Sequence, residues 1–235
     1  MEILEIFKKD GILAVIKPQG FASVPGKLPD ICSAVLKKYP HIAQVNGFNK
    51  SEGGLLNRLD NETGGILLFA ETDEAFEYYK KAKINKYYYA ITNRRPEWIE
   101  KDVDFPIAHH YSDKARMVTI IPDKEKSLKY RGKPQNAQTH LRFIKEIDFQ
   151  ILIEAQITKG CRHQIRCHMA SVNLPILGDK LYSKTKNATT YHQLYCYKVA
   201  FKTLSGENVE IEHIPEELKK FFFHSFSVGS HHVGA

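Results

Sequence analysis

The feature that most constrains the fold is a series of short β-type segments interrupted by only a few helical stretches. Apolar, β-branched and aromatic residues dominate the β-type segments, at residues 11–17, 65–70, 86–92, 139–147, 150–157, 194–204 and 208–213. Helical patterns follow Asp30, Thr72, Gly160 and Pro215, and the last of these extends through Phe223. This order predicts a mixed α+β protein with a largely antiparallel, bent sheet flanked by helices.

The remaining segments predict a single domain. Residues 109–138 are polar, and we interpret them as an irregular loop in which the charged stretch 123–133 is mobile. Residues 225–235 are small and polar, which is typical of a disordered tail. We therefore expect one catalytic-size domain over residues 1–224.

Composition favours a polyanionic partner. Lysine and arginine total 34 against 27 aspartate and glutamate residues, a net charge of +7 that suits nucleic acid, although a merely basic enzyme has the same balance. No apolar run approaches the ~18 residues that span a bilayer, and the first residues lack a signal-peptide pattern. The four cysteines form no C-x-x-C pair. We expect a cytoplasmic monomer with no membrane association and no obligate protein partner.

The carboxylate of Asp60 is the first candidate for chemistry. It lies in 57-NRLDNETGG-65, in a turn before a buried strand, and Arg58 could hold it ionised. A carboxylate in a partly dry pocket can act as a nucleophile or a base. Gly64 and Gly65 would let the backbone turn tightly and leave the carboxylate open to a large substrate. An aspartate that only caps a turn produces the same local pattern.

A second candidate is the cluster 162-RHQIRCH-168. Its two arginines and two histidines on a short helix suit phosphate, and Arg162 and Arg166, four positions apart, would share one face. The alternatives are a surface helix with a basic face and a zinc site. The zinc site would use thiolates and imidazoles at a spacing unusual for zinc modules, from Cys161, His163, Cys167 and His168.

A third candidate is the strand 86-KYYYA-90. Alternation places Tyr87 and Tyr89 on one face of the strand, and Tyr88 with Lys86 on the other. A tyrosine beside a basic strand could stack on a nucleic-acid base. Tyrosines that simply pack in the core explain the segment equally well.

Taken together, these blocks resemble the RluA family of pseudouridine synthases. The matching stretches cover most of the chain: 10-DGILAVIKPQGF-21, 57-NRLDNETGGILLFA-70, 86-KYYYA-90, 160-GCRHQIRCHMASVNLPILGDKLY-182 and, more weakly, 132-GKPQNAQT-139. The resemblance implies the pseudouridine synthase fold, represented by the catalytic domain without a separate S4-type RNA-binding domain.

The resemblance also implies an activity and its catalytic residues. The family isomerises uridine in ribosomal or transfer RNA to pseudouridine without a metal or cofactor. Asp60 matches the catalytic aspartate, which is either a nucleophile at C1′ or a base that removes the 2′ proton. Tyr88 would stack on the detached uracil and could transfer a proton. Arg166 would pair with Asp60 and keep it ionised.

RNA contacts are implied as well, because a base must leave its stack to be reached. Arg58 matches the arginine that helps to occupy the gap, and the further RNA-binding candidates are Arg162, His163 and Lys86. The chain departs from the family pattern at Asn57, Gly65 and Cys161, where histidine, serine and arginine are usual. A non-catalytic RNA binder that kept the fold is the alternative function.

Overall fold

The computed structural model describes residues 2–122, 129–184 and 189–222, so the predicted disordered tail lies outside the described residues. Nine strands form the main sheet, in the order β1-β2-β3-β11-β4-β10-β9-β5, with β12 paired to β11. They are β1 (Glu5–Lys9), β2 (Ile12–Lys17), β3 (Gly64–Ala70), β4 (Asn85–Thr92), β5 (Glu100–Val103), β9 (Thr139–Ile147), β10 (Gln150–Ile157), β11 (Leu194–Lys202) and β12 (Asn208–Glu212). Within this described sheet only β3 and β11 pair in parallel, which confirms the predicted mixed, largely antiparallel α+β architecture.

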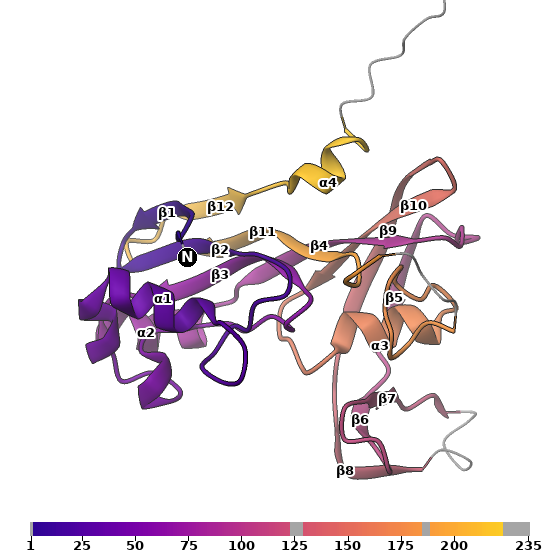
Figure 1. Ribbon diagram of the computed structural model, residues 1–235, viewed down its shortest axis with the longest axis horizontal. Coiled ribbons are helices and arrows are strands. Elements are labelled where there is room, and N and C mark those ends of the chain that lie inside the picture. Colours follow the sequence, from indigo (N-terminus) through magenta and orange to yellow (C-terminus); the bar gives the residue numbers. More distant parts are fainter. Residues whose placement is uncertain (1, 123–128, 185–188, 223–235) are drawn as a thin grey trace, which may run out of the picture.

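Helices cover the sheet unequally. Figure 1 shows α1, α2 and α3 below the sheet and α4 above it. The helices are α1 (Ile31–Lys38), α2 (Asp73–Lys81), α3 (Gln164–Ser171) and α4 (Glu216–Lys219), with 3-10 turns η1 (Pro40–Gln44) and η2 (Lys50–Glu52). In the described ranges no helix has the length and apolar character needed to cross a membrane. The last helix was predicted to extend to Phe223, a residue outside the described ranges. In the structure α4 already ends at Lys219, so the predicted helix is too long.

The predicted caps explain where two of these helices begin. The Asp30 carboxylate accepts a hydrogen bond from the Ser33 amide at 2.7 Å, and the Thr72 hydroxyl accepts one from the Ala75 amide at 3.1 Å. Both bonds satisfy amide groups that the first turn of a helix leaves without an intrahelical partner.

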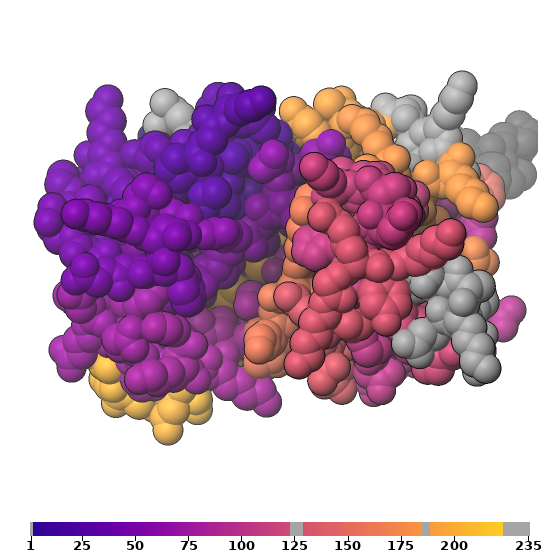
Figure 2. Space-filling model, turned by 90° about the horizontal axis from the view of Figure 1, so that it is seen from below, coloured from indigo at the N-terminus to yellow at the C-terminus, as the bar shows by residue number. Residues whose placement is uncertain are grey.

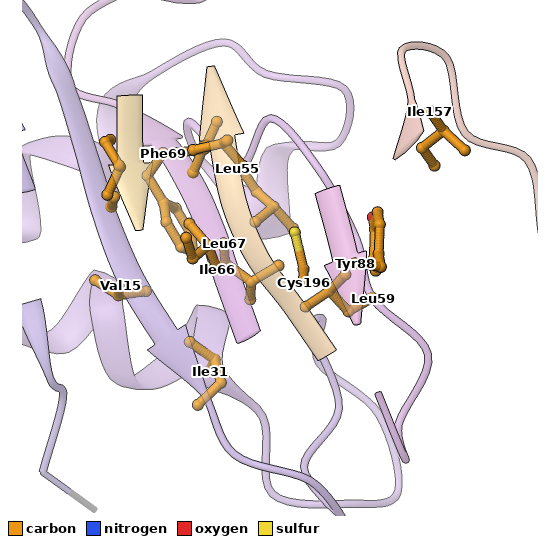
Figure 3. Close-up of a cluster of buried hydrophobic side chains, with 14 of the residues drawn as sticks. Val15, Ile31, Leu55, Leu59, Ile66, Leu67, Phe69, Tyr88, Ile157 and Cys196 are labelled. Atoms are coloured by element: carbon orange, nitrogen blue, oxygen red, sulfur yellow. The ribbon is translucent and has the colours of Figure 1, made fainter. Parts of the chain in front are cut away.

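The hydrophobic core lies on both faces of the sheet. The larger cluster joins β2, β3 and β11 to α1, α2 and α3, and Figure 3 shows Leu67, Phe69 and Cys196 within it. Tyr88 belongs to this cluster, whereas Tyr89 belongs to the cluster under α4 and stacks on Tyr197 with ring centroids 3.7 Å apart. The predicted alternation along β4 is therefore confirmed, and it turns Tyr88 toward the face that carries α3.

The interpretation of residues 109–138 as an irregular loop was wrong. They contribute to a second sheet, β7-β6-β8, which lies below α3 in Figure 1. Its strands are β6 (Ile107–His110), β7 (Met117–Thr119) and β8 (Tyr130–Gln135); residues 123–128 of the predicted mobile stretch lie outside the described residues. Ile107 and Met117 are buried against Cys167 of α3. This sheet is thus supported by tertiary packing that the polar local sequence does not reveal.

Candidate active site

Asp60 lies in a turn that is held from the end of β2. The Thr63 amide donates to the Asp60 carbonyl at 3.0 Å and closes the turn. The fully buried Lys17 ammonium donates to the Asn61 carbonyl at 2.9 Å, and also to the carbonyls of Pro18 and Phe21. Burial lowers the pKa of Lys17 to about 7, an effect that the nearby Asp60 charge opposes. Three carbonyl acceptors thus surround the buried Lys17 amine, and the bond to Asn61 ties the turn to the end of β2.

The two glycines after the turn were predicted to let the backbone turn tightly, but they have a different structural role. Gly64 and Gly65 begin β3 and do not form the turn. At Gly65 the backbone has φ +118°, and a Cβ atom would lie 2.2 Å from the Cys196 carbonyl oxygen. Glycine is needed at this position because β3 and β11 approach closely.

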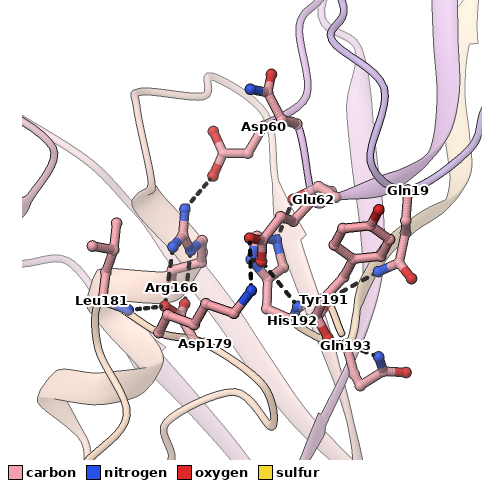
Figure 4. A network of polar contacts seen from close by, with 12 residues as sticks. Gln19, Asp60, Glu62, Arg166, Asp179, Leu181, Tyr191, His192 and Gln193 are labelled. Atoms are coloured by element: carbon pink, nitrogen blue, oxygen red, sulfur yellow. Dashed lines mark hydrogen bonds and ion pairs between the residues drawn. The ribbon is translucent and has the colours of Figure 1, made fainter. Parts of the chain in front are cut away.

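A buried arginine joins Asp60 to a second carboxylate. Arg166 Nη1 donates to Asp60 Oδ2 at 2.8 Å, while Nε and Nη2 donate to the two Asp179 oxygens at 2.7 and 3.0 Å (Figure 4). Burial disfavours these charges, but the two carboxylates raise the pKa of Arg166, and Arg166 keeps the pKa of Asp179 below its usual value. The predicted Arg166–Asp60 pair is therefore present in the structure, and Asp179 orients the arginine.

Tyr88 and Lys86 reach the same cavity from β4. Tyr88 is 6% exposed, and burial raises the pKa of its phenol well above the usual value, with further contributions from the Cys196 thiol and Asp60. The phenol therefore keeps its proton at neutral pH. Lys86, two positions earlier on the same side of the strand, is half-buried, and burial lowers its pKa.

The α3 region is not the surface helix with a basic face that the sequence left as an alternative. Arg162 precedes α3 and is exposed, whereas Arg166 belongs to α3 and is buried. The two arginines therefore do not share one face of a helix. His163 lies in a left-handed backbone conformation, contacts Tyr182 Oη at 2.9 Å and has Nε2 3.7 Å from Asp60 Oδ2. Burial lowers the pKa of His163 to about 4, although Asp60 opposes this shift, so the ring is neutral at pH 7.

The remaining residues of that cluster are structural. His168 is buried between Thr139 Oγ1, at 2.8 Å, and the Phe105 carbonyl, at 2.9 Å, and Cys167 packs against β6 and β7. These contacts anchor α3 between the two sheets. In the three described ranges no set of three or more His, Cys, Asp or Glu side chains is placed to hold a metal ion.

Asn57 and Arg58 precede Asp60 in the chain, and each forms hydrogen bonds with a different group. Arg58 Nη2 donates to both oxygens of the buried Glu52 carboxylate at 2.7 Å, while about half of the arginine side chain stays exposed. Asn57 accepts from the Leu68 amide at 2.8 Å and donates to the Ile66 carbonyl at 3.2 Å. The asparagine thus binds the backbone of β3, and Arg58 remains available at the surface.

A cavity of about 940 Å³ joins these side chains. Figure 2 shows a hollow between the N-terminal part of the molecule, in indigo and purple, and the part in pink and orange. All of the predicted site residues line the cavity: Arg58, Asp60, Lys86, Tyr88, Arg162, His163 and Arg166. The volume is within the range of pockets that enclose small-molecule ligands.

Sequence reasoning assigned no role to several polar residues beneath the cavity. Asp179 is one, although it stands in the stretch 160–182 that carries the family resemblance. His192 is another: its Nε2 lies 2.8 Å from Thr63 Oγ1, and its Nδ1 lies 3.3 Å from Glu62 Oε2. Burial, and then the charge of Arg166, lower the pKa of His192 to about 4. His192 is far along the chain from Thr63, so the local sequence gives no signal of the contact between them.

The comparisons with known proteins agree with this fold. A family model described as RNA pseudouridylate synthase matches residues 11–171, and the chain therefore belongs to that family. Two human proteins of known structure share the fold. RNA pseudouridylate synthase domain containing 1 has a TM-score of 0.71 at 18% identity, with coverage of 91% of this chain and 84% of that one. Domain containing 4 has a TM-score of 0.66 at 21% identity, with coverage of 92% and 90%.

Several curated relatives carry the name ribosomal large subunit pseudouridine synthase D. The protein of Vibrio parahaemolyticus is 33% identical over 75% of this chain, and that of Nitrosomonas europaea is 30% identical over 77%. This chain spans only about half of their lengths, 51% and 49%. The protein of Zymomonas mobilis is 27% identical over 92% of this chain and is spanned over 71% of its own length.

Proposed function

We propose that this protein is an RNA pseudouridine synthase, an isomerase that converts uridine in ribosomal or transfer RNA to pseudouridine with Asp60 as its catalytic carboxylate. The observation that carries the proposal is the Asp60 carboxylate held 2.8 Å from the buried Arg166 in a cavity that Tyr88 also lines. We further propose that residues 1–224 form the catalytic domain and that it acts in the cytoplasm as a monomer.

The proposed reaction is balanced without an oxidant or reductant. The bond between N1 of uracil and C1′ of ribose breaks, the base turns, and C5 bonds to C1′. C5 then loses a proton and N1 gains one, so no cofactor is required to carry electrons. Asp60 either attacks C1′ or removes the 2′ proton, and Arg166 orients the carboxylate in both routes.

Tyr88 is proposed to hold the uracil while it turns. Its ring lies in the cavity wall, and its phenol is protonated at neutral pH because it is buried. The protonated phenol can donate a hydrogen bond. It can accept a proton only if another group removes the phenolic proton. We therefore assign it stacking on the detached base and proton transfer coupled to that base.

RNA binding is proposed to depend on cations around the opening of the cavity. Arg58 and Arg162 are exposed and line the cavity, Lys86 lies deeper, and the chain carries a net charge of +7. Because His163 is neutral, we assign it contacts by hydrogen bonding rather than by charge. The names of the curated relatives make large-subunit ribosomal RNA the first substrate to test, and transfer RNA the second.

The test is pseudouridine mapping of RNA from cells whose only copy of the gene is wild type or encodes Asp60→Asn. In parallel, the purified proteins are assayed on unmodified ribosomal and transfer RNA transcripts. We expect a site that is present with the wild type and lost with Asp60→Asn, with the rate lowered at least about 100-fold. The matched control is Glu77→Gln, an exposed carboxylate on α2, which should leave the rate unchanged.

RNA affinity shows whether a modification lost with Asp60→Asn reflects lost chemistry or lost binding. Asp60→Asn should bind RNA within about threefold of the wild type, because phosphate contacts dominate affinity. Identical maps for both genes, with the proteins shown to be expressed, would contradict catalysis and leave an RNA binder.

A further inference from the structure

One exposed aromatic side chain on the molecule lies beside the candidate active site. Phe48 is 55% exposed, and it also lines the cavity that holds Asp60 and Arg58. Other large hydrophobic side chains are exposed in the described ranges, such as Tyr111 and Phe149, but within those ranges Phe48 alone among them lines this cavity. A single exposed apolar residue is ordinary on a protein surface, so its position at the opening is the informative observation.

The loop that carries Phe48 is fixed on both sides of the ring. On one side, the Asn46 amide and side chain donate to the Asp73 carboxylate at 2.6 and 2.8 Å. On the other, the Asn49 side chain donates to Glu52 Oε1 at 2.8 Å, and Glu52 also holds Arg58. The ring therefore projects from an anchored loop, and the same buried carboxylate ties that loop to the arginine at the cavity.

Gly47 explains how the loop reaches this position. A Cβ atom there would lie 1.9 Å from the Gly53 carbonyl oxygen and 3.3 Å from the Phe76 ring. The backbone before Phe48 is therefore pressed against the turn after η2, and only glycine fits without a shift of that turn. The placement of the aromatic ring is built into the backbone of the molecule.

The surroundings of the ring suit a nucleotide. Phe76 supports Phe48 edge to face, with centroids 5.0 Å apart, and the Lys80 ammonium lies 5.9 Å from the Phe48 centroid. Arg58, about half exposed, supplies a second cation in the same cavity wall. A flat apolar surface with cations beside it fits a base and the phosphates attached to it.

We infer that Phe48 is a base-stacking platform for an unstacked RNA base next to the target uridine. This inference rests on the proposed function, because the cavity accepts the flipped uridine and the rim must then accept its neighbour. Stacking on Phe48 would fix the strand at the opening while Asp60 and Tyr88 act on the flipped nucleotide. Phe48 is thus a binding and positioning residue and takes no part in the chemical step.

The test compares Phe48→Leu, Phe48→Tyr and wild type in steady-state kinetics on a short RNA that contains the mapped uridine. The control is Phe149→Leu, an 88% exposed phenylalanine outside the cavity lining. Leucine keeps an apolar contact with Phe76 but lacks a stacking face. We expect Phe48→Leu to raise KM at least about fivefold with kcat within about twofold, and Phe48→Tyr and Phe149→Leu to match the wild type.

A second set of RNAs makes the inference independent of how well the variants fold. In these RNAs the base on the 5′ or the 3′ side of the target uridine is replaced by an abasic residue. For the wild type, one of the two replacements should raise KM by the same factor as Phe48→Leu, and on that RNA the two proteins should become equal. The inference is overturned if the wild type is insensitive to both replacements, or if Phe48→Leu weakens binding equally on every RNA.

Failure of the inference and failure of the proposed function are distinguishable. If the wild type forms no pseudouridine on any RNA, the proposed function fails first. If the wild type is active and Phe48→Leu has an unchanged KM, only the stacking platform fails.

Discussion

The floor and the rim of the cavity both carry arginine side chains, but in opposite surroundings. The floor consists of Asp60, Tyr88, Arg166 and His192, with Asp179 beneath them, and the rim consists of Phe48, Arg58, Arg162 and Lys180. On the floor the Arg166 side chain is 7% exposed and that of Asp179 is 1% exposed, whereas at the rim Lys180 is 67% exposed. Burial, more than residue type, therefore decides what a charge does in this protein.

Burial makes the floor depend on matched partners. Moving a charge out of water costs several kcal/mol, and attraction between well-placed partners offsets this cost only while each partner is present. An exposed cation keeps its water, is screened by salt and gains little from any one neighbour. The floor should therefore respond to substitution through stability and geometry, and the rim through RNA affinity.

The largest effect is expected at the buried carboxylate that orients Arg166. Asp179→Ala leaves Arg166 with Asp60 alone and should lower the free energy of unfolding by about 3–5 kcal/mol, as for other broken buried pairs. Urea denaturation measures the change. Pseudouridine formation should fall with it, because Arg166 then loses two of the three hydrogen bonds that set its direction.

The matched control for that change is a surface ion pair. Glu77→Ala removes a carboxylate that pairs with the exposed Lys80 and should change the free energy of unfolding by no more than about 0.5 kcal/mol. Equal losses for Asp179→Ala and Glu77→Ala would contradict the distinction between floor and surface.

An intermediate effect is expected from pH, through the buried histidines. The pKa of His192 is lowered from 6.5 to about 4 in the folded protein, so the folded state favours the neutral ring. As pH falls below 6.5 the unfolded ring binds a proton before the folded one does, and stability is lost progressively until about pH 4. At about pH 5 this residue alone should cost about 1–2 kcal/mol relative to pH 7.

The variant His192→Gln tests that assignment. It removes one titrating ring and should make the acid side of a plot of unfolding free energy against pH shallower, while His163 continues to contribute to it. An acid limb of the same slope in His192→Gln and wild type would mean that other groups cause the loss.

The smallest effect on stability is expected at the rim. The double variant Arg162→Gln, Lys180→Gln should unfold within about 0.5 kcal/mol of the wild type, because both side chains are exposed. Its RNA affinity should fall, and the slope of log affinity against log salt should become shallower by about 1 for each phosphate that the protein no longer neutralises. Fluorescence anisotropy at several salt concentrations gives both quantities. An unchanged slope with weaker binding would show that these residues contact RNA without neutralising phosphate.

Local signals predicted some elements well and others badly. Asp30 and Thr72 cap their helices as expected, and 65–70 and 150–157 are strands, because capping and apolar patterns act over a few residues. The polar β8 failed as a prediction because its strand pairing depends on β6 and on the packing of that sheet beneath α3. The short β1 was missed, because its two apolar residues, Ile6 and Phe7, are adjacent and stand between exposed charged residues.

The sequence by itself determined most strands of the main sheet, the positions of the helices, the caps and the presence of Asp60, Tyr88 and Arg166 in recognisable blocks, since these depend on nearby residues and on residue type. Tertiary structure alone decided that Asp179 orients a buried Arg166, that His192 contacts Thr63, and that Phe48 projects at the cavity rim. These contacts join residues far apart in the chain, and their strength depends on burial. Burial is a property of the packed molecule, and no local stretch of sequence records it.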